Sequence, residues 1–519
     1  MRVLVLGLGL IMLSHLTYAV TGSAKENEQR PNILFAFADD QSWLHTGFNG
    51  DRNTRTPNFD RIAREGVNFT HCFSACPSCT PSRSAVLTGQ HIWRLKQAGV
   101  LYGSIPKDVP LFPLLLSDSG YHVGYTGKGW VPGDPFALGL ERYPIGREYN
   151  DAKNRFVASG LNDQDYAENF RLFLKDRPEN SPFFFWFGCK EPHRVYEDGI
   201  GKRLGKTTKD VSVPAFFPDD EVIRSDILDY CVEIEYFDRQ LGQMIKQLEE
   251  AGELDNTIII VTSDNGMPFP RCKTTLYDYG TRMPMAIRWN NIPPNRQIDD
   301  FVLLTDLAPT ILEAAGLEIP KQMTGKSLLP MLTSTKDGRI ESARDYVITA
   351  VERHTWCRPD GATYPSRAIR NYDYLYIRNL KPDRWPTGGP SFVSSNKTFH
   401  GDVDACPTKT FMVKNERQFP REYDLCFGKR PLEELYDVRN DVWQVKNLAD
   451  DPELADVKKK LWRQLQEKLQ STGDPRMENK DPWKDYVYRQ TIGFGATFNA
   501  SLSEEERRLA RERASHKPE

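Results

Sequence analysis

The stretch YFDRQLGQMIKQLEEAGELDNTIIIVTSDNG, residues 236–266, decides the fold class. Its first half carries apolar residues at helical spacing and ends at a glycine turn, and the β-branched run that follows predicts a buried strand. The strand ends directly on Asp264 and Asn265. A helix followed closely by an apolar strand is typical of α/β proteins, in which helices cover both faces of a mostly parallel sheet.

The same alternation recurs along the first two thirds of the chain. Apolar strands and amphipathic helices are predicted in RPNILFAFADD (30–40), TPNFDRIAREGVNFTHCFS (56–74), PLFPLLLSDSGYHVGYTGK (110–128), SPFFFWFGCKEPH (181–193) and LLTDLAPTILEAAGLEIP (303–320). Several of these strands end in polar residues, and ligands of such sheets bind at the carboxyl ends of the strands. The pattern therefore predicts one site that is assembled from distant pieces of sequence.

After about residue 335 the pattern changes to short strands. The segments 344–354, 366–380 and 429–441 favour antiparallel pairing, and 451–470 favours an amphipathic helix with oppositely charged pairs. We therefore expect a larger domain at 28–335, a smaller α+β domain at 336–480, and a charge-dense, solvated tail at 481–519.

The chain has 519 residues, of which 39% are hydrophobic, and a net charge of −3. No global charge favours nucleic acid, and no segment after the N-terminus is apolar for long enough to span a bilayer. Residues 1–24, MRVLVLGLGLIMLSHLTYAVTGSA, are typical of a secretory signal peptide, although a buried first strand is the alternative. We expect export to a periplasm or the exterior, or to a lysosomal-type lumen in a eukaryotic source. Disulfides among the nine cysteines are permitted but not required.

One motif is far more specific than the rest. CTPSRSAVLTG, residues 79–89, resembles the signature of the type I sulfatases, and FADDQ (37–41), TGK (126–128), EPH (191–193), TSDNG (262–266) and ELYDVRNDVWQVKNLADDPE (434–453) resemble further family segments in the family's order. Within the family, SDNGMPFP (263–270) and YPSRAIRNYDYLYIRNL (364–380) look closest to the N-sulfoglucosamine sulfohydrolase, or sulfamidase, branch. The resemblance implies an alkaline-phosphatase-like fold.

The resemblance also implies the chemistry of Cys79. In the family this cysteine is oxidised to formylglycine (3-oxoalanine) by a formylglycine-generating or anaerobic maturation enzyme. The hydrated aldehyde attacks sulfur, and its second hydroxyl then expels sulfate. Pro81 and Ser82 indicate a helix start whose N–H groups face the anion, with Ser82 as the expected cap, and Arg83 can brace the diol or the sulfate. A structural cysteine in a capped turn is the alternative.

Asp39, Asp40, Asp264 and Asn265 form an all-oxygen set, which suits Ca²⁺ or Mg²⁺ rather than zinc. By resemblance Ca²⁺ is the expected ion, bound together with the group at Cys79. Taken singly, the acidic pair would be a helix cap and the Asp-Asn-Gly a turn.

Three further residues match family positions. Lys128 and Lys273 match the sulfate-binding lysines, and His193 matches the histidine that protonates the leaving group. A surface lysine and a loop histidine are the alternatives. The chain departs from the family at Trp130, where many members carry a histidine. Tryptophan cannot accept a proton but can stack on a sugar ring, so we expect Trp130 to contact substrate.

The segment ERHTWCRPDGATYPSRAIR, residues 352–370, is rich in cations and aromatics. In the resembled family the smaller domain overhangs the site, so we expect His354, Arg358 and Arg367 to bind an anionic sugar, with Trp356 and Tyr364 beside them. The alternative is that they tie the two domains together.

These observations predict a secreted, formylglycine- and Ca²⁺-dependent sulfatase acting on a polyanionic saccharide. O-sulfate is favoured over N-sulfate because Trp130 breaks the sulfamidase pattern. The alternatives are a sulfamidase acting on heparan-type glycans, a phosphodiesterase or phosphonate hydrolase of the same superfamily, and a glycan-binding protein with an unmodified Cys79.

Overall fold

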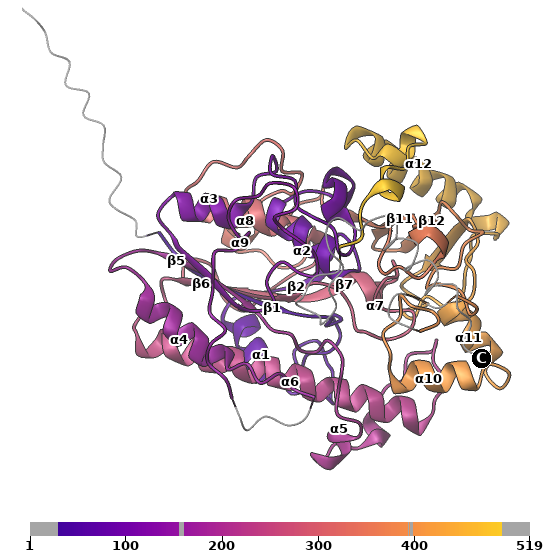
Figure 1. Ribbon diagram of the computed structural model, residues 1–519, viewed down its shortest axis with the longest axis horizontal. Helices are drawn as coiled ribbons and strands as arrows, with labels where there is room; N and C mark the ends of the chain where they lie inside the picture. The colour runs from indigo at the N-terminus through magenta and orange to yellow at the C-terminus, as the bar shows by residue number, and fades with distance from the viewer. Residues whose placement is uncertain (1–29, 155–159, 393, 395–397, 490–519) are drawn as a thin grey trace, which may run out of the picture.

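The computed structural model describes residues 30–154, 160–392, 394 and 398–489. Figure 1 shows a large sheet between two layers of helices, with the C-terminal part of the chain on one side of it. The predicted signal peptide and residues 490–519 lie outside the described residues. Within the described ranges, no helix combines the length and the apolar character needed to cross a membrane.

The large sheet has nine strands in the described part of the chain. They are β1 (Asn32–Ala38), β2 (Val67–Phe73), β3 (His122–Gly127), β4 (Arg147–Glu148), β5 (Phe183–Gly188), β6 (Thr257–Ser263), β7 (Arg282–Arg288), β8 (Arg296–Ile298) and β9 (Val302–Leu303). Their spatial order is β4-β3-β5-β1-β6-β7-β2-β8, and β9 also pairs with β2. Only β7 runs antiparallel to its neighbours β6 and β2, so the predicted mixed, mostly parallel sheet is confirmed.

Helices cover both faces of this sheet (Figure 1). The helices of this part of the chain are α1 (Pro57–Glu65), α2 (Cys79–Thr88), α3 (Phe112–Asp118), α4 (Tyr166–Asp176), α5 (Ile200–Arg203), α6 (Glu221–Glu250), α7 (Asp278–Thr281), α8 (Leu307–Ala314) and α9 (Leu329–Thr333). Side chains of α1, α4 and α6 fill one core, and side chains of α2, α3, α8 and α9 fill the other. The alternating residues of β1 divide between these two cores, which explains why its sequence is apolar throughout.

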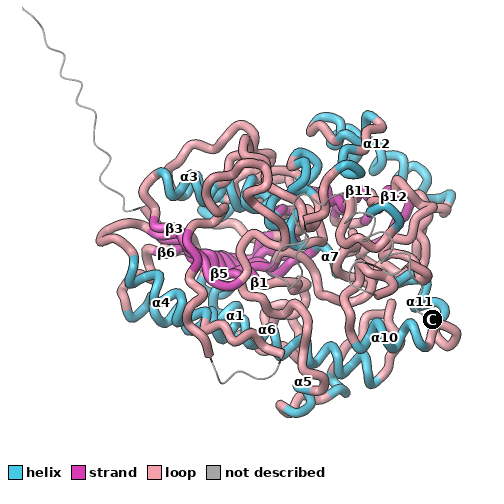
Figure 2. Tube along the Cα trace, viewed as in Figure 1, coloured by secondary structure: helices cyan, strands magenta, loops and turns pink. Residues whose placement is uncertain are grey.

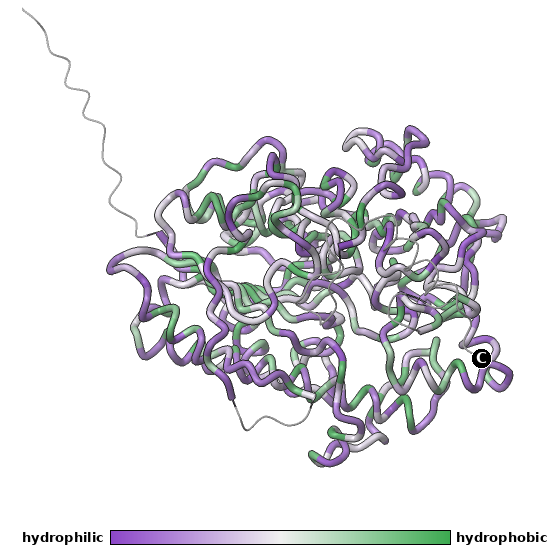
Figure 3. Tube along the Cα trace, viewed as in Figure 1, coloured by the Kyte–Doolittle hydropathy of each residue, from purple (hydrophilic) through white to green (hydrophobic). Residues whose placement is uncertain are grey.

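Figure 3 shows hydrophobic residues concentrated along the sheet and hydrophilic residues along the outer helices. The long helix α6 begins at Glu221, before the stretch 236–266 in which the helical pattern is seen, and the side chain of Asp220 caps it by accepting a hydrogen bond from the Val222 N–H at 2.9 Å.

The smaller sheet is antiparallel, as predicted, and lies beside the large one (Figure 2). Its strands are β10 (Tyr346–Val351), β11 (Ser366–Asn371), β12 (Tyr374–Asn379) and β13 (Glu433–Asp437), accompanied by α10 (Pro407–Lys414), α11 (Pro420–Phe427) and α12 (Ala455–Ser471). Ile348 and Ile369 of this sheet share a core with Ala85 of α2. The smaller sheet therefore supports the helix that carries Cys79.

Short 3₁₀ helices connect these elements. They are η1 (Ile92–Arg94), η2 (Lys96–Gly99), η3 (Thr208–Asp210), η4 (Leu304–Asp306), η5 (Pro359–Gly361), η6 (Pro452–Leu454), η7 (Pro475–Glu478) and η8 (Pro482–Asp485). The last of them lies at the start of the predicted tail, yet Trp483 in it is buried. Arg489 N donates to Tyr102 O at 2.7 Å, so this segment packs on the larger domain. Residues 481–489 therefore belong to the folded chain, and the remainder of the predicted tail, residues 490–519, lies outside the described residues.

Candidate active site

Four neighbouring parallel strands end at the candidate site. In the order β3-β5-β1-β6, the first is followed directly by Lys128, the third by Asp39 and Asp40, and the fourth by Asp264 and Asn265. Because these strands run in the same direction, their carboxyl ends share one edge of the sheet. The structure thus brings together residues that lie far apart in the sequence.

The register between β1 and β6 places the acidic residues side by side. Ala38 pairs with Ser263, so the residues that follow leave the sheet together. Asp40 N donates to Asp264 Oδ1 at 3.1 Å, and Asn265 Nδ2 donates to Asp40 Oδ1 at 2.5 Å. Asp40 has a φ of 74°, in the left-handed region. Such strain is retained where the surroundings impose it, which is common at functional sites.

Cys79 occupies the first turn of α2, which starts at this residue. Its Sγ lies 3.6 Å from Asp39 Oδ1 and 4.0 Å from Asp40 Oδ1. The prediction that Ser82 caps the helix is wrong, because the N-cap is Ser78 and Ser82 lies inside the helix, where its Oγ donates to Asp264 O at 2.6 Å. The N-terminal end of α2, which carries a partial positive charge, therefore lies beside the carboxylates.

Two cations bind these carboxylates: Lys128, which directly follows β3, and Arg83, which lies in α2. Lys128 Nζ contacts Asp39 Oδ1 at 2.7 Å and Oδ2 at 2.5 Å. Arg83 Nε donates to Asp264 Oδ2 at 2.8 Å, and Arg83 Nη1 donates to Lys128 O at 3.0 Å. Arg83 is fully buried, so these bonds hold its guanidinium rigidly against both strand ends.

A second group of polar residues surrounds Asp40. Lys273 Nζ lies 2.7 Å from Asp40 Oδ2 and 3.2 Å from Asp404 Oδ2. His193 Nε2 lies 3.9 Å from Asp40 Oδ2, while its Nδ1 is 2.7 Å from Arg194 O. A carbonyl oxygen can only accept, so Nδ1 carries the proton of the neutral imidazole and Nε2 faces the site.

The two neighbouring aspartates titrate differently. Burial alone would raise the pKa of Asp39, but Lys128, with His193 and Arg83, lowers this pKa well below its usual range. Burial raises the pKa of Asp40 to about 6, although Lys273 opposes the shift. Burial likewise raises the pKa of Asp264 to about 6, against the effect of Arg83. Together with Asp404, four carboxylates face the three protein cations Arg83, Lys128 and Lys273, and an additional cation would offset the remaining negative charge.

Burial raises the pKa of the Cys79 thiol well above its ordinary value, although Lys128 and Lys273 oppose the shift. The thiolate is the nucleophilic form of cysteine, so an unmodified Cys79 would be a poor nucleophile. All nine cysteines lie in the described residues, and each is buried and free of disulfide bonds. The high pKa argues against ordinary thiol chemistry at this site.

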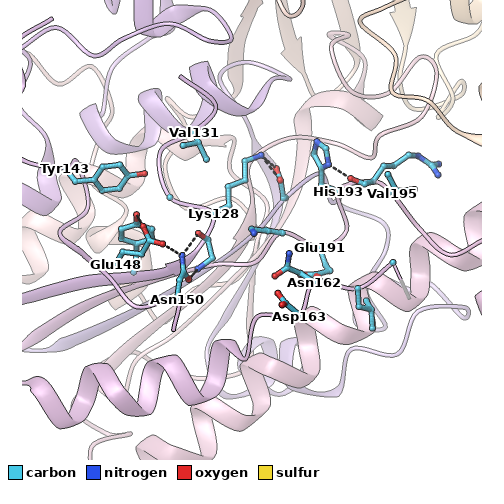
Figure 4. A pocket seen from close by; sticks show the side chains of 18 residues that line it. Lys128, Val131, Tyr143, Glu148, Asn150, Asn162, Asp163, Glu191, His193 and Val195 are labelled. Carbon is cyan, nitrogen blue, oxygen red and sulfur yellow. Dashed lines mark hydrogen bonds and ion pairs between the residues drawn. The ribbon is translucent and has the colours of Figure 1, made fainter. Parts of the chain in front are cut away.

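A cavity of about 680 Å³ opens beside the site (Figure 4). The residues that line it include Asp39, Lys128 and His193 of the candidate site, together with Tyr143, Glu148, Asn150, Asn162, Asp163, Glu191 and Val195. Its lining combines polar and apolar surface in nearly equal amounts, as suits a ligand such as a sugar.

Comparison with known proteins identifies the family. The family model described as Sulfatase matches residues 31–317, which is more than half of the chain. The chain belongs to the sulfatase family. A second model, described as N-sulphoglucosamine sulphohydrolase, C-terminal, matches residues 272–377 of this sulfatase. The resemblance seen in the sequence is confirmed, and the enzyme is a sulfuric ester hydrolase.

The sulfatase has relatives along most of its length. An ulvan-active sulfatase of Formosa agariphila is 28% identical over 87% of this chain and 82% of the relative. The human N-sulphoglucosamine sulphohydrolase is 28% identical over 86% of this chain and 91% of the relative. The solved structure of BT4656 in complex with D-glucosamine-2-N,6-O-disulfate has a TM-score of 0.63 at 20% identity and covers 87% of this chain and 100% of that chain. The last similarity supports the fold alone.

Trp130 does not face the substrate side of the sulfatase. Its side chain is 0% exposed, and its Nε1 donates to Ser84 Oγ of α2 at 2.8 Å. The ring belongs to the core between the sheet and α2, so it has no surface for stacking on a sugar. We therefore assign Trp130 to the support of α2 rather than to substrate binding.

The cations of the segment 352–370 divide into two groups. His354 lies at the site, where its Nδ1 is 2.7 Å from the Oγ of the N-cap Ser78, and burial lowers its pKa to about 4. Arg358 instead donates to Asp402 Oδ2 at 2.8 Å and to two backbone carbonyls. Arg367 is 0% exposed and lies between Glu352 and Asp474 at 2.7 and 2.6 Å. The two arginines have the structural role that the sequence left open as an alternative.

Replacing Arg367 with methionine should destabilise the sulfatase by about 3–5 kcal/mol, because Asp474 would remain buried without its partner. Thermal unfolding measures the effect. The matched control is Arg378→Met on the neighbouring strand, since Arg378 pairs with Glu433 near the surface and such pairs are worth about 0–1 kcal/mol. Lost saccharide turnover in Arg367→Met at an unchanged melting temperature would return Arg367 to substrate binding.

Two site residues carried no sequence signal strong enough to assign them a role. Asp404 lies in a loop without a recognised motif, yet it contacts Lys273. Glu191 belongs to the EPH motif, and its carboxylate accepts from Asn162 N at 2.7 Å and Tyr166 Oη at 2.9 Å. Its backbone carbonyl also accepts from Asp39 N at 3.1 Å. Glu191 thus fixes the loop that carries His193 against the end of β1.

Proposed function

We propose that this sulfatase hydrolyses O-sulfate esters on a polyanionic saccharide, using formylglycine at position 79 and a bound Ca²⁺. The observation that carries the proposal is the convergence of Asp39, Asp40 and Cys79, whose ligand atoms lie within 4.8 Å of one another. A structural cysteine in a capped turn would not need two buried carboxylates beside it, because burying charge is costly unless it serves binding or catalysis.

The residues present fit a hard cation. Asp39, Asp40, Asp264 and Asn265 offer oxygen atoms only, which Ca²⁺ prefers, with Mg²⁺ as the alternative. Asn265 Oδ1 is buried and has no hydrogen-bond partner among the described residues, as expected for an atom reserved for a metal. When bound, the cation would supply a positive charge that stabilises oxyanions at position 79.

A formylglycine at position 79 would supply a hydrated aldehyde as the nucleophile toward sulfur, in place of a thiol that burial keeps protonated. The other residues supply charge and position. Lys128 and Lys273 reach the carboxylates from β3 and from the loop after β6, and their ammonium groups can neutralise sulfate oxygens. Arg83 holds Asp264 and the carbonyl of Lys128, which fixes the strand ends around the first turn of α2.

His193 is proposed to protonate the leaving group through Nε2. Burial and Lys273 lower the pKa of His193, so an imidazolium there, protonated at both nitrogens, gives up its Nε2 proton more readily than a free imidazolium does. His193→Ala should reduce turnover of alkyl sulfates, whose alcohol leaves poorly, by about 10²–10⁴-fold, and should affect activated aryl sulfates far less. Rates on a series of leaving groups measure this. An equal loss on both substrate classes would leave His193 with a binding role only.

O-sulfate is proposed over N-sulfate because Trp130 stands where the sulfamidase branch carries a histidine. The alternative, an N-sulfoglucosamine sulfohydrolase, is favoured by the match to that family's C-terminal model and by the 28% identity to the human enzyme. The relatives act on ulvan and on glucosamine sulfates according to their names, so a sulfated glycan is the proposed substrate class in either case. Sulfate release from a panel of defined oligosaccharides tests the choice, and release from glucosamine N-sulfate alone would overturn the O-sulfate proposal.

The proposed function also implies where the enzyme acts and how it matures. Residues 1–24 are proposed to direct export, and a formylglycine-generating or anaerobic maturation enzyme is the expected partner. Mass analysis of the peptide that contains Cys79 and of the mature N-terminus tests both statements.

A further inference from the structure

One buried arginine beside the active site has no counter-ion among the residues that the structure describes. Arg353 follows β10, its side chain is 2% exposed, and it forms no ion pair with any carboxylate of the described residues. Its Nη2 donates to Tyr486 O at 3.2 Å, and its Nε is buried without a partner. Burial lowers the pKa of Arg353 to about 10. Keeping such a charge unpaired is costly, which points to a bound anion that neutralises it.

Several other buried arginines among the described residues satisfy their charge within the protein, and Arg271, which also forms no ion pair and has an unpartnered Nε, donates to two backbone carbonyls. Arg358 and Arg367 form ion pairs with buried carboxylates, and Arg83 pairs with Asp39 and Asp264. Arg296 lacks a near carboxylate, but it donates to several backbone carbonyls. Arg353 differs from all of these because only one backbone carbonyl receives its guanidinium.

The surroundings of Arg353 connect it to Cys79. Its guanidinium carbon lies 5.5 Å from the centre of the Tyr488 ring and 5.9 Å from that of Trp356. Tyr488 belongs to the same buried cluster as Cys79, and Trp356 packs against that cluster. Arg353 O also accepts a hydrogen bond from Leu101 N, and Leu101 is another member of the cluster.

Trp356 offers a second unsatisfied donor. Its Nε1 is buried and has no hydrogen-bond partner among the described residues. Arg353 Nε and Trp356 Nε1 are thus two unsatisfied N–H donors, one of them charged, and a carboxylate or a sulfate has the two or more oxygens that can accept from both. The rings of Trp356 and Tyr488, 6.0 Å apart, provide aromatic surface beside these donors. A sugar that carries an oxyanion matches this combination of donors and rings.

We propose that Arg353 and Trp356 form a specificity site for a second oxyanion of the saccharide, distinct from the sulfate that is cleaved at Cys79. The proposal rests on the proposed function, because it names a further feature of the same substrate. The second group is a carboxylate or another sulfate, on the same sugar or on its neighbour. The preferred substrate therefore carries at least two negative charges.

The test compares three kinds of substrate in the full chain: an aryl sulfate, a saccharide with one sulfate, and the same saccharide with a second sulfate or an adjoining uronate. Arg353→Met should lower kcat/KM on the doubly anionic saccharides by about tenfold to a hundredfold, which is the range for a hydrogen bond to a charged group. It should change the other two substrates by about twofold or less, and Arg353→Lys should recover part of the loss. The larger loss, on the sulfate or on the uronate, identifies the second group.

Thermal unfolding separates this role from a structural one. Arg353→Met should keep or raise the melting temperature, because it removes an unpaired buried charge. Arg358→Met, five positions away, should lower it, because Asp402 would lose its partner. An equal loss of activity on all three substrates, an unchanged rate on the doubly anionic saccharides, or a fall in melting temperature like that of Arg358→Met would each overturn the proposal.

A measurement of binding without turnover distinguishes the proposed sulfatase function from the proposed second oxyanion site. Calorimetry with a non-hydrolysable, doubly anionic disaccharide should show tighter binding to the wild type than to Arg353→Met. If the wild type binds this probe through Arg353 but releases no sulfate from any substrate, the proposed function fails and the second oxyanion site stands. If turnover is normal and binding does not depend on Arg353, this site alone is refuted.

Discussion

Replacing Cys79 with alanine should abolish sulfate release, with a loss on the order of 10⁶-fold, as found when a covalent nucleophile is removed. The side chain lies at the first turn of α2, and no other described nucleophile shares its position between Asp39 and Asp40. Sulfate release from a saccharide and from an aryl sulfate measures the loss. The melting temperature should fall by no more than it does in Cys76→Ala, because both changes remove one buried sulfur atom.

Cys76→Ala is the matched control for this change. Cys76 is also buried, lies three positions earlier, and packs in the core shared with the smaller sheet. It should cost about 1 kcal/mol of stability and leave turnover intact. Mass spectrometry of the peptide that contains position 79 completes the test, since full activity in protein whose Cys79 remains a thiol would contradict the formylglycine mechanism.

Removing the divalent cation should eliminate activity and lower the melting temperature, and Ca²⁺ should restore both. A ligand present at a hundred times its dissociation constant stabilises the folded state by about 2.7 kcal/mol. Asp264→Asn should reproduce the loss, because it removes one of the three buried carboxylates and leaves Arg83 without its closest partner. Activity and thermal unfolding, each measured with a chelator and with added Ca²⁺, test the prediction.

Asp229→Asn provides the control for the metal experiment. Asp229 is buried as well, but its carboxylate accepts from the N–H groups of Gly199 and Gly201 at 2.8 Å, away from the strand ends. This variant should lose stability without losing its response to Ca²⁺. Full activity in demonstrably metal-free wild type would refute the metal prediction.

The sequence predicted the structure correctly at positions where the residue type has a single physical explanation. Polar residues directly after apolar strands, such as Asp39 and Asp264, predicted the edge of the sheet at which the site lies, because parallel strands share that edge. The signature at residues 79–89 has many fixed positions, and a match of that length predicted that Cys79 and Arg83 belong to the site. The alternation of strands and helices was sufficient for the fold class.

The sequence was uninformative wherever the direction of a side chain depends on packing. Trp130 could equally have been a stacking platform, and only the position of Ser84 beneath it places the ring in the core. Arg353, Arg358 and Arg367 look alike in one cationic segment, but Glu352, Asp402 and Asp474 neutralise only the latter two. These partners lie in loops whose courses no local pattern predicts.

The burial of Cys79 determines whether this residue can be modified before or after the chain folds. Tyr488 belongs to the cluster that encloses Cys79. Cys79 is therefore covered in part by a residue that is synthesised about 400 residues later. In the folded protein Cys79 is 2% exposed, which is too little for the active site of a second protein to reach its side chain. If Cys79 is converted to formylglycine as proposed, the enzyme that oxidises it must act on the growing or unfolded chain. A cell that lacks this enzyme during synthesis would accumulate folded, inert protein that later addition of the enzyme cannot rescue without unfolding.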